Sequence, residues 1–124
     1  IHRGTHINQY LTFDEFACKC HYGDCTRTVY STRTTDAFLD TRTEFGRPII
    51  IGSGFRCQRH NTNISGRASS FHMIGHAIDM TPRYYPEDNS SEIRRSLLDE
   101  LERIAREHID YVERHEDFIH CHHL

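Results

Sequence analysis

The sequence lacks any long apolar run. Its hydrophobic stretches fall well short of the roughly 20 residues that a membrane-spanning helix needs, so we expect no membrane span. It also lacks internal repeats, low-complexity tracts and a composition shift that would mark a linker. The 124 residues, of which 36% are hydrophobic, suffice for one modest core. We therefore expect a single domain over residues 1–124.

An excess of positive charge is absent as well. Fifteen lysines and arginines face eighteen acidic residues, which gives a formal net charge of -3 at pH 7. A nucleic-acid partner normally requires a basic face, so we expect no such partner. Lysine itself is nearly missing, with Lys19 alone against fourteen arginines, and nothing in the sequence explains this bias. No targeting segment is visible.

Histidine and cysteine, by contrast, are abundant, with eleven and five copies. Histidine is the commonest metal ligand in proteins. The spacing of Cys18, Cys20 and Cys25 is compatible with a disulfide knot or with a structural zinc site. An odd number of cysteines leaves at least one free thiol if the others pair. Disulfides would indicate an oxidising compartment.

Apolar spacing, capping residues and glycine breaks predict a mixed chain. A short helix is expected after Thr12, because Glu15 stands three residues later and completes a capping box. Longer helices are expected over Thr34–Phe45 and Ser91–Glu107. Strands are expected in the segments RPIIIGSG, GHAIDM, IDYVE and DFIHC, with a tight connection between the last two. This order of helices and strands along the chain predicts an α+β fold with a small, mostly antiparallel sheet and flanking helices.

The segment SSFHMIGHAIDMTP combines metal-capable side chains with a turn. His72 ends a polar loop, Gly75 lets the chain turn, and Asp79 lies on the strand that follows. A catalytic zinc takes three N, O or S ligands and keeps one position open. The segment DFIHCHH offers a third ligand, His120, on a later strand. His122 shares the strand face of His120, whereas Cys121 points the other way and is expected to be a buried thiol.

A zinc hydrolase also needs a base and a donor for the developing oxyanion. Asp117 precedes His120 by three residues, so in a flat strand it would face away from the metal. We therefore expect it on a turn or a bulge. Arg56 follows a Ser-Gly break at a strand end and is the candidate cation. Each residue alone also has a structural explanation, such as a turn cap for Asp79 or a surface ion pair for Arg56.

Taken together, these motifs resemble those of a known protein family. SGFR, then SxHxxGxAxD (Ser70 to Asp79), then DFIH, resemble the zinc peptidases of the D-Ala-D-Ala carboxypeptidase family. Phage endolysins that cleave cell walls and hedgehog-like domains belong to the same fold group. The opening LTFDEFACKC is similar to the start of the small single-domain members, so the resemblance covers nearly the whole chain.

The resemblance implies a hedgehog-like or peptidase-like α+β fold and one zinc per chain, held by His72, Asp79 and His120. It implies Asp117 as the general base, Arg56 as the group that binds a substrate carboxylate or the oxyanion, and Ser70 as a substrate-binding residue. The implied substrates are peptide bonds involving D-amino acids in peptidoglycan stem peptides. The protein would cut them as a D,D-carboxypeptidase or as an endopeptidase lysin. It would act at the cell wall, as a periplasmic, extracellular or phage-delivered protein.

One position departs from the family pattern. His122 stands where the family usually has an aspartate, and a ligand histidine normally has its second nitrogen fixed by an acceptor. A neutral His122 could accept that bond or could itself bind the metal. Two other classes remain open, a non-catalytic zinc-stabilised binding module and a disulfide-rich structural component of a virion or cell surface. Asp117 separates them from the enzyme, because a binding module needs no base. The sequence leaves the oligomeric state open.

Overall fold

A four-stranded antiparallel sheet forms the centre of the molecule. The computed structural model describes residues 6–19, 28–64, 66 and 70–123. The sheet has the strand order β3-β4-β6-β5, and every neighbouring pair is antiparallel. Its strands are β3 (Ile49–Ser53), β4 (Ala77–Pro82), β5 (Tyr111–Arg114) and β6 (Ile119–His122). The α+β fold with a small antiparallel sheet is therefore confirmed.

Several helix ends coincide with capping residues. They are α1 (Phe13–Phe16), α2 (Thr32–Phe45), α3 (Gln58–Asn63), α4 (Ser91–His108) and the 3-10 helix η1 (Phe71–Ile74). Thr12 and Glu15 form the expected capping box at α1. The Ser90 hydroxyl accepts a hydrogen bond from the backbone N–H of Ile93 at the start of α4. Gly46 ends α2 in the left-handed conformation, with φ of 77°.

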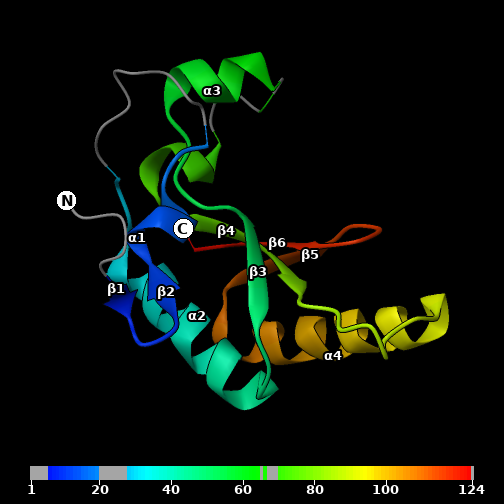
Figure 1. Cartoon of the computed structure of the whole chain (residues 1–124). Coiled ribbons are helices and arrows are strands. Elements are labelled where there is room, and N and C mark those ends of the chain that lie inside the picture. Colours follow the sequence, from blue (N-terminus) through cyan, green and yellow to red (C-terminus); the bar gives the residue numbers. More distant parts are fainter. Residues whose placement is uncertain (1–5, 20–27, 65, 67–69, 124) are drawn as a thin grey trace.

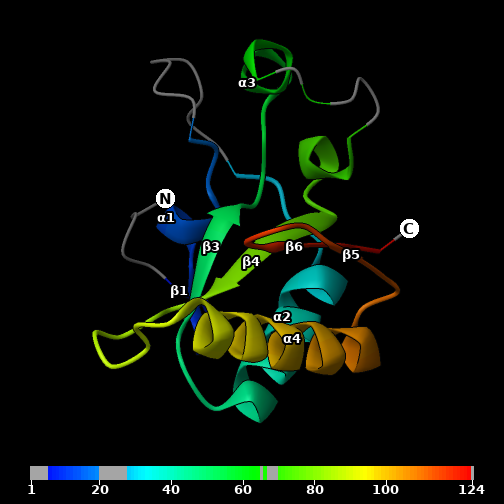
Figure 2. The same cartoon turned by 90° about the vertical axis from the view of Figure 1, so that its right-hand side faces the viewer.

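The two long helices cover one face of the sheet. Figures 1 and 2 show α2 and α4 on this side, with α3 on the other side. The main core lies between this face and the helices, and strand alternation supplies its side chains. Fully or almost fully buried members include Phe38, Ile78, Met80, Leu98, Leu101, Ile104, Ile119 and Cys121. The opposite face of the sheet carries the polar side chains of Asp79, His120 and His122, together with the apolar residues Ile50 and Ala77.

Three features differ from the sequence expectation. A two-stranded hairpin, β1 (His6–Asn8) with β2 (Leu11–Thr12), precedes α1. Strands of two or three residues are too short to show alternation in a sequence. The long segment between β3 and β4, for which the sequence predicted no helix, contains both α3 and η1. None of the helices in the described part of the chain is long and apolar enough to cross a membrane.

Candidate metal centre

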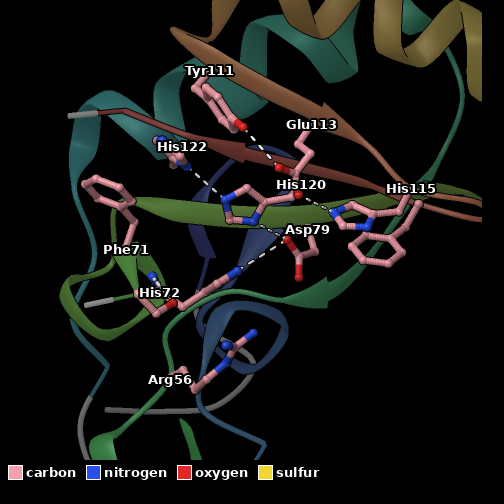
Figure 3. Close-up of a pocket in the computed structure, with 11 residues that line it drawn as sticks. Arg56, Phe71, His72, Asp79, Tyr111, Glu113, His115, His120 and His122 are labelled. Atoms are coloured by element: carbon pink, nitrogen blue, oxygen red, sulfur yellow. Dashed lines mark hydrogen bonds and ion pairs between the residues drawn. The ribbon is translucent and has the colours of Figure 1, made fainter. Parts of the chain in front are cut away.

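Three metal-capable side chains meet on the polar face of the sheet. Ligand atoms of His72, Asp79 and His120 all lie within 4.8 Å of one another. Asp79 Oδ1 is 3.3 Å from His72 Nε2 and 2.9 Å from His120 Nδ1. The structure thus brings together the three residues that were expected to bind zinc (Figure 3).

Local structure fixes the His72 ring. Ser70 caps η1, because its hydroxyl accepts a hydrogen bond from the His72 backbone N–H at 3.2 Å. The ring Nδ1–H donates to the carbonyl of Gly54 at 2.8 Å, so the bare Nε2 faces Asp79. A metal-bound histidine usually holds its second nitrogen in this way. The side chain is only 3% exposed, and its orientation is therefore set before any ligand arrives.

Two positions that support His72, Gly54 and Gly75, require glycine. A Cβ on Gly54 would lie 2.5 Å from the Phe16 ring, and one on Gly75 would lie 2.2 Å from the Val29 carbonyl oxygen. Gly75 also has φ of 72°, in the left-handed region that side chains disfavour. These two close approaches let the backbone bring His72 over the end of β3.

Asp79 and His120 are neighbours across the β4–β6 ladder, where their Cα atoms are register partners. The β3 strand is irregular between Ile51 and Ser53, beside Asp79. Burial acts to raise the pKa of Asp79, but the close contacts with the His120 and His72 rings outweigh it and lower the pKa to about 2. The carboxylate is therefore ionised and suited to a cation.

His122 supports the far side of His120. Its Nδ1 lies 2.8 Å from His120 Nε2, so a neutral His122 can accept the proton of that nitrogen. The His122 ring is stacked between Phe71 and Tyr111, with ring centroids 4.2 and 4.3 Å away. Burial lowers the pKa of His122, and the neighbouring His120 lowers it further. Both effects favour the neutral form that an acceptor requires.

The donor set fits a zinc ion. Two imidazole nitrogens and one carboxylate oxygen form a common catalytic zinc set with an open position. Metal–ligand distances of about 2.0–2.2 Å in a tetrahedron place ligand atoms about 3.3 Å apart. The measured separations of 3.3 and 2.9 Å from Asp79 Oδ1 are close to this value. Each histidine also has a partner for its second nitrogen, as a metal site requires.

A cleft of about 510 Å³ surrounds these three side chains. Arg56 and Ser70 line it, together with His122. The Arg56 guanidinium is held by Asn61 Oδ1 at 3.0 Å and by Ser53 Oγ at 3.2 Å. Burial lowers the pKa of Arg56 while nearby Asp79 raises it. The result is a fixed cation at one side of the metal-capable group.

Asp117 lies in the turn between β5 and β6, as the strand-parity argument required. Its side chain is exposed, and it lines a neighbouring pocket together with Asp79, Tyr84 and Arg94. The Thr81 hydroxyl donates to its backbone carbonyl at 3.3 Å. Asp117 is thus not among the residues that line the cleft around the three metal-capable side chains, although both pockets share Asp79.

Sequence reasoning missed another carboxylate, Glu113, which lines the cleft around the three metal-capable side chains. Its Cα is the register partner of His120 on β5. Alternation along IDYVE places Tyr111 and Glu113 on one face, but only the hairpin register shows that this face meets His120. That register was the information the sequence did not supply.

The cysteine site has no support in the structure. Cys20 and Cys25 lie outside the described residues. Cys18 belongs to neither of the two metal-capable groups that the described residues form, the second being Glu44, Glu107 and His108 on the surface. The Cys18 sulfur instead accepts a hydrogen bond from the backbone N–H of Cys57 at 3.3 Å. A second zinc on these cysteines is therefore not retained.

Comparison with known proteins agrees with this geometry. No curated protein matches the chain. The family described as Peptidase M15 matches residues 9–122, which is almost the entire chain. The matched range contains the three metal-capable residues, Arg56 and Asp117. The chain belongs to the Peptidase M15 family of zinc peptidases, which act on peptidoglycan-type substrates and include D-Ala-D-Ala carboxypeptidases and endolysins.

Proposed function

We propose that this protein is a zinc-dependent hydrolase of peptide bonds involving D-amino acids in peptidoglycan stem peptides. It acts as a D,D-carboxypeptidase or as an endopeptidase, at the cell wall, as a periplasmic, extracellular or phage-delivered protein. The observation that carries the proposal is the convergence of His72, Asp79 and His120 in one open cleft. Family membership supports the same conclusion.

The three ligand residues have a defined task. Zinc, when bound, would polarise a carbonyl and lower the pKa of a bound water. Asp79 supplies a carboxylate that is ionised at any working pH, since its pKa is about 2. His72 and His120 supply nitrogens whose direction is fixed by Gly54 and His122. These contacts hold the ligands in place before substrate binds.

Asp117 is the proposed general base. It takes the proton from the attacking water and returns it to the leaving amine. Asp117 lies in the turn just before β6. The pocket that it lines adjoins the metal-site cleft, because Asp79 lines both. The side chain of Asp117 is exposed, and active-site hydrogen bonds often tighten only when substrate binds.

Arg56 is the proposed partner of a negative charge on the substrate. Its planar fork matches a carboxylate, and the same group would stabilise an oxyanion. Ser70 lines the cleft beside it and is the proposed second substrate contact. Because Ser70 also caps η1, the two roles share one side chain.

A zinc-stabilised binding module is the second candidate, and the exposed position of Asp117 favours it. A module would keep the metal ligands and would not depend on Asp117. The two candidates therefore give opposite results when only this carboxylate is changed.

The test is the turnover of purified muropeptides by the zinc-loaded protein and by its Asp117→Asn variant, with released fragments identified by mass. The enzyme should release fragments, and the variant should be slower by about 10²–10⁴-fold with zinc content unchanged. Glu116→Gln removes a neighbouring exposed carboxylate and serves as the matched control. Full activity in Asp117→Asn would show that Asp117 is not the general base. Absence of turnover in the unmodified protein would favour the binding module.

A further inference from the structure

The cleft has two walls of opposite charge. The strand order β3-β4-β6-β5 places Asp79 and His120 on the two inner strands. Arg56 follows β3 at one edge of the sheet, and Glu113 lies on β5 at the other edge. Figure 3 shows the two side chains on opposite sides of the metal-capable group. A substrate across the metal centre would thus meet a cation at one end and an anion at the other.

Two neighbours on the same edge of the cleft orient the Glu113 carboxylate. The Tyr111 hydroxyl donates to Oε2 at 3.0 Å, and His115 Nε2 lies 2.7 Å from Oε1. The side chain of Glu113 is 38% exposed, so a ligand in the cleft can reach it. Within the described part of the chain, its ion pair is with His115, and no arginine or lysine forms one with it.

This arrangement suits ion pairing better than proton transfer. The hydrogen bond from Tyr111 is the main cause that lowers the pKa of Glu113, with His115 adding to it. A general base works best with a pKa near the operating pH, so such a carboxylate is a weak candidate for that role. Each carboxylate oxygen can accept two hydrogen bonds, however, and each accepts one here. The free acceptor positions are available to a charged donor.

We propose that Glu113, held by Tyr111 and His115, forms a subsite for a substrate ammonium group, so that the cleft selects peptides with a positive charge near the cleaved bond. The inference rests on the proposed peptidase function and specifies its substrate class. Two parts of a stem peptide can supply such a group, the side-chain amine of a diamino acid and a free amino terminus.

The experiment uses three synthetic stem peptides that differ only in acetylation. One keeps the side-chain amine free, the second keeps the amino terminus free, and the third has both amines acetylated. Turnover (kcat/KM) and peptide binding to the zinc-loaded protein are both measured, for the unmodified protein, Glu113→Gln and the control Glu116→Gln. We expect one free-amine peptide to be preferred over the doubly acetylated peptide by about tenfold, since hydrogen bonds to charged groups are the strong ones. The preferred peptide identifies the source of the ammonium group.

Glu113→Gln should reduce this preference to about one, and Glu116→Gln should keep it. Equal use of all three peptides by the unmodified protein, with turnover intact, would overturn the subsite and leave the peptidase standing. Loss of activity by Glu113→Gln with the preference intact would also overturn it. If no peptide is cleaved, the binding data still decide: a preference that disappears in Glu113→Gln supports the subsite while the peptidase proposal fails. Binding without preference overturns the subsite in that case too.

Discussion

The two faces of the central sheet differ sharply although they share the same strands. On β6, Ile119 and Cys121 are fully buried against the helices, whereas His120 and His122 face the cleft and are half-buried. On β5 the same alternation sends Val112 into the core and Glu113 to the cleft. A period of two residues therefore separates the side chains that hold the fold from those that form the site.

Stability and chemistry should therefore be separable in this protein. Substitutions on the cleft face remove metal ligands or their supports and leave the main core intact. Substitutions on the core face lower the free energy of unfolding without touching a ligand. If the separation holds, the effect of a substitution on the metal centre should decrease from the ligands, through their supports, to the core.

The largest effect is expected from ligand removal. His72→Ala with His120→Ala deletes two of three ligands, so zinc content and turnover should both fall to background. Far-UV circular dichroism should stay unchanged, because neither side chain belongs to the main core. His108→Ala, in the surface group with Glu44 and Glu107, is the control and should keep its zinc. If the double variant retained zinc, the metal would have to bind at other residues.

Lowering the pH should weaken zinc binding on the cleft face. Ligand imidazoles must be neutral to bind a metal, so protons compete with zinc and the affinity falls as the pH is lowered. Each imidazole that takes up a proton as the pH falls should weaken zinc binding by up to about tenfold per pH unit. Asp79 adds nothing between pH 7 and 4, because its pKa of about 2 keeps it ionised. Chelator competition across this range measures the slope, and a flat profile would contradict a two-histidine site.

A smaller effect is expected at His122. His122→Phe can keep the stacking on Phe71 and Tyr111 but removes the acceptor for His120 Nε2. Zinc affinity should fall by about 10–100-fold, as is typical when the support of a ligand histidine is lost. His122→Asp restores an acceptor at this position, and it should recover most of the affinity. Equal zinc binding in His122→Phe and the unmodified protein would show that this support is dispensable.

The sequence was sufficient for much of the cleft face. Residue type and spacing predicted that His72, Asp79 and His120 converge, and strand parity predicted both the buried Cys121 and the turn position of Asp117. The buried position of Cys121 and the turn position of Asp117 need only alternation along β6. The meeting of His120 with Asp79 needs the pairing of β4 with β6, which the sequence indicated only through the types and order of the three residues.

The remaining features depend on contacts between distant segments. Glu113 meets His120 only because the β5–β6 register pairs them, and a shift of one residue would turn Glu113 away. The helix η1, which orients His72, lies in a segment without periodic apolar residues. Its position depends on the backbone approaches at Gly54 and Gly75 that only the folded chain shows. The aromatic stack around His122 likewise joins η1, β5 and β6.

The core face supplies the smallest expected effect on the metal centre, at Cys121. This side chain is 0% exposed and lies between its register partners Ile78 and Val112, and burial raises the pKa of its thiol. Cys121→Ser would place a hydroxyl group in an apolar site, and an unsatisfied polar group there costs about 1–3 kcal/mol of unfolding free energy. Cys121→Ala, which introduces no polar group, should cost less than an unsatisfied hydroxyl. Both variants should bind zinc with unchanged affinity, since the thiol faces away from His120. Denaturant titration and chelator competition on the same samples measure the two quantities. Zinc lost from a folded Cys121→Ala protein would show that the core side chain reaches the metal, and the separation of the two faces would fail.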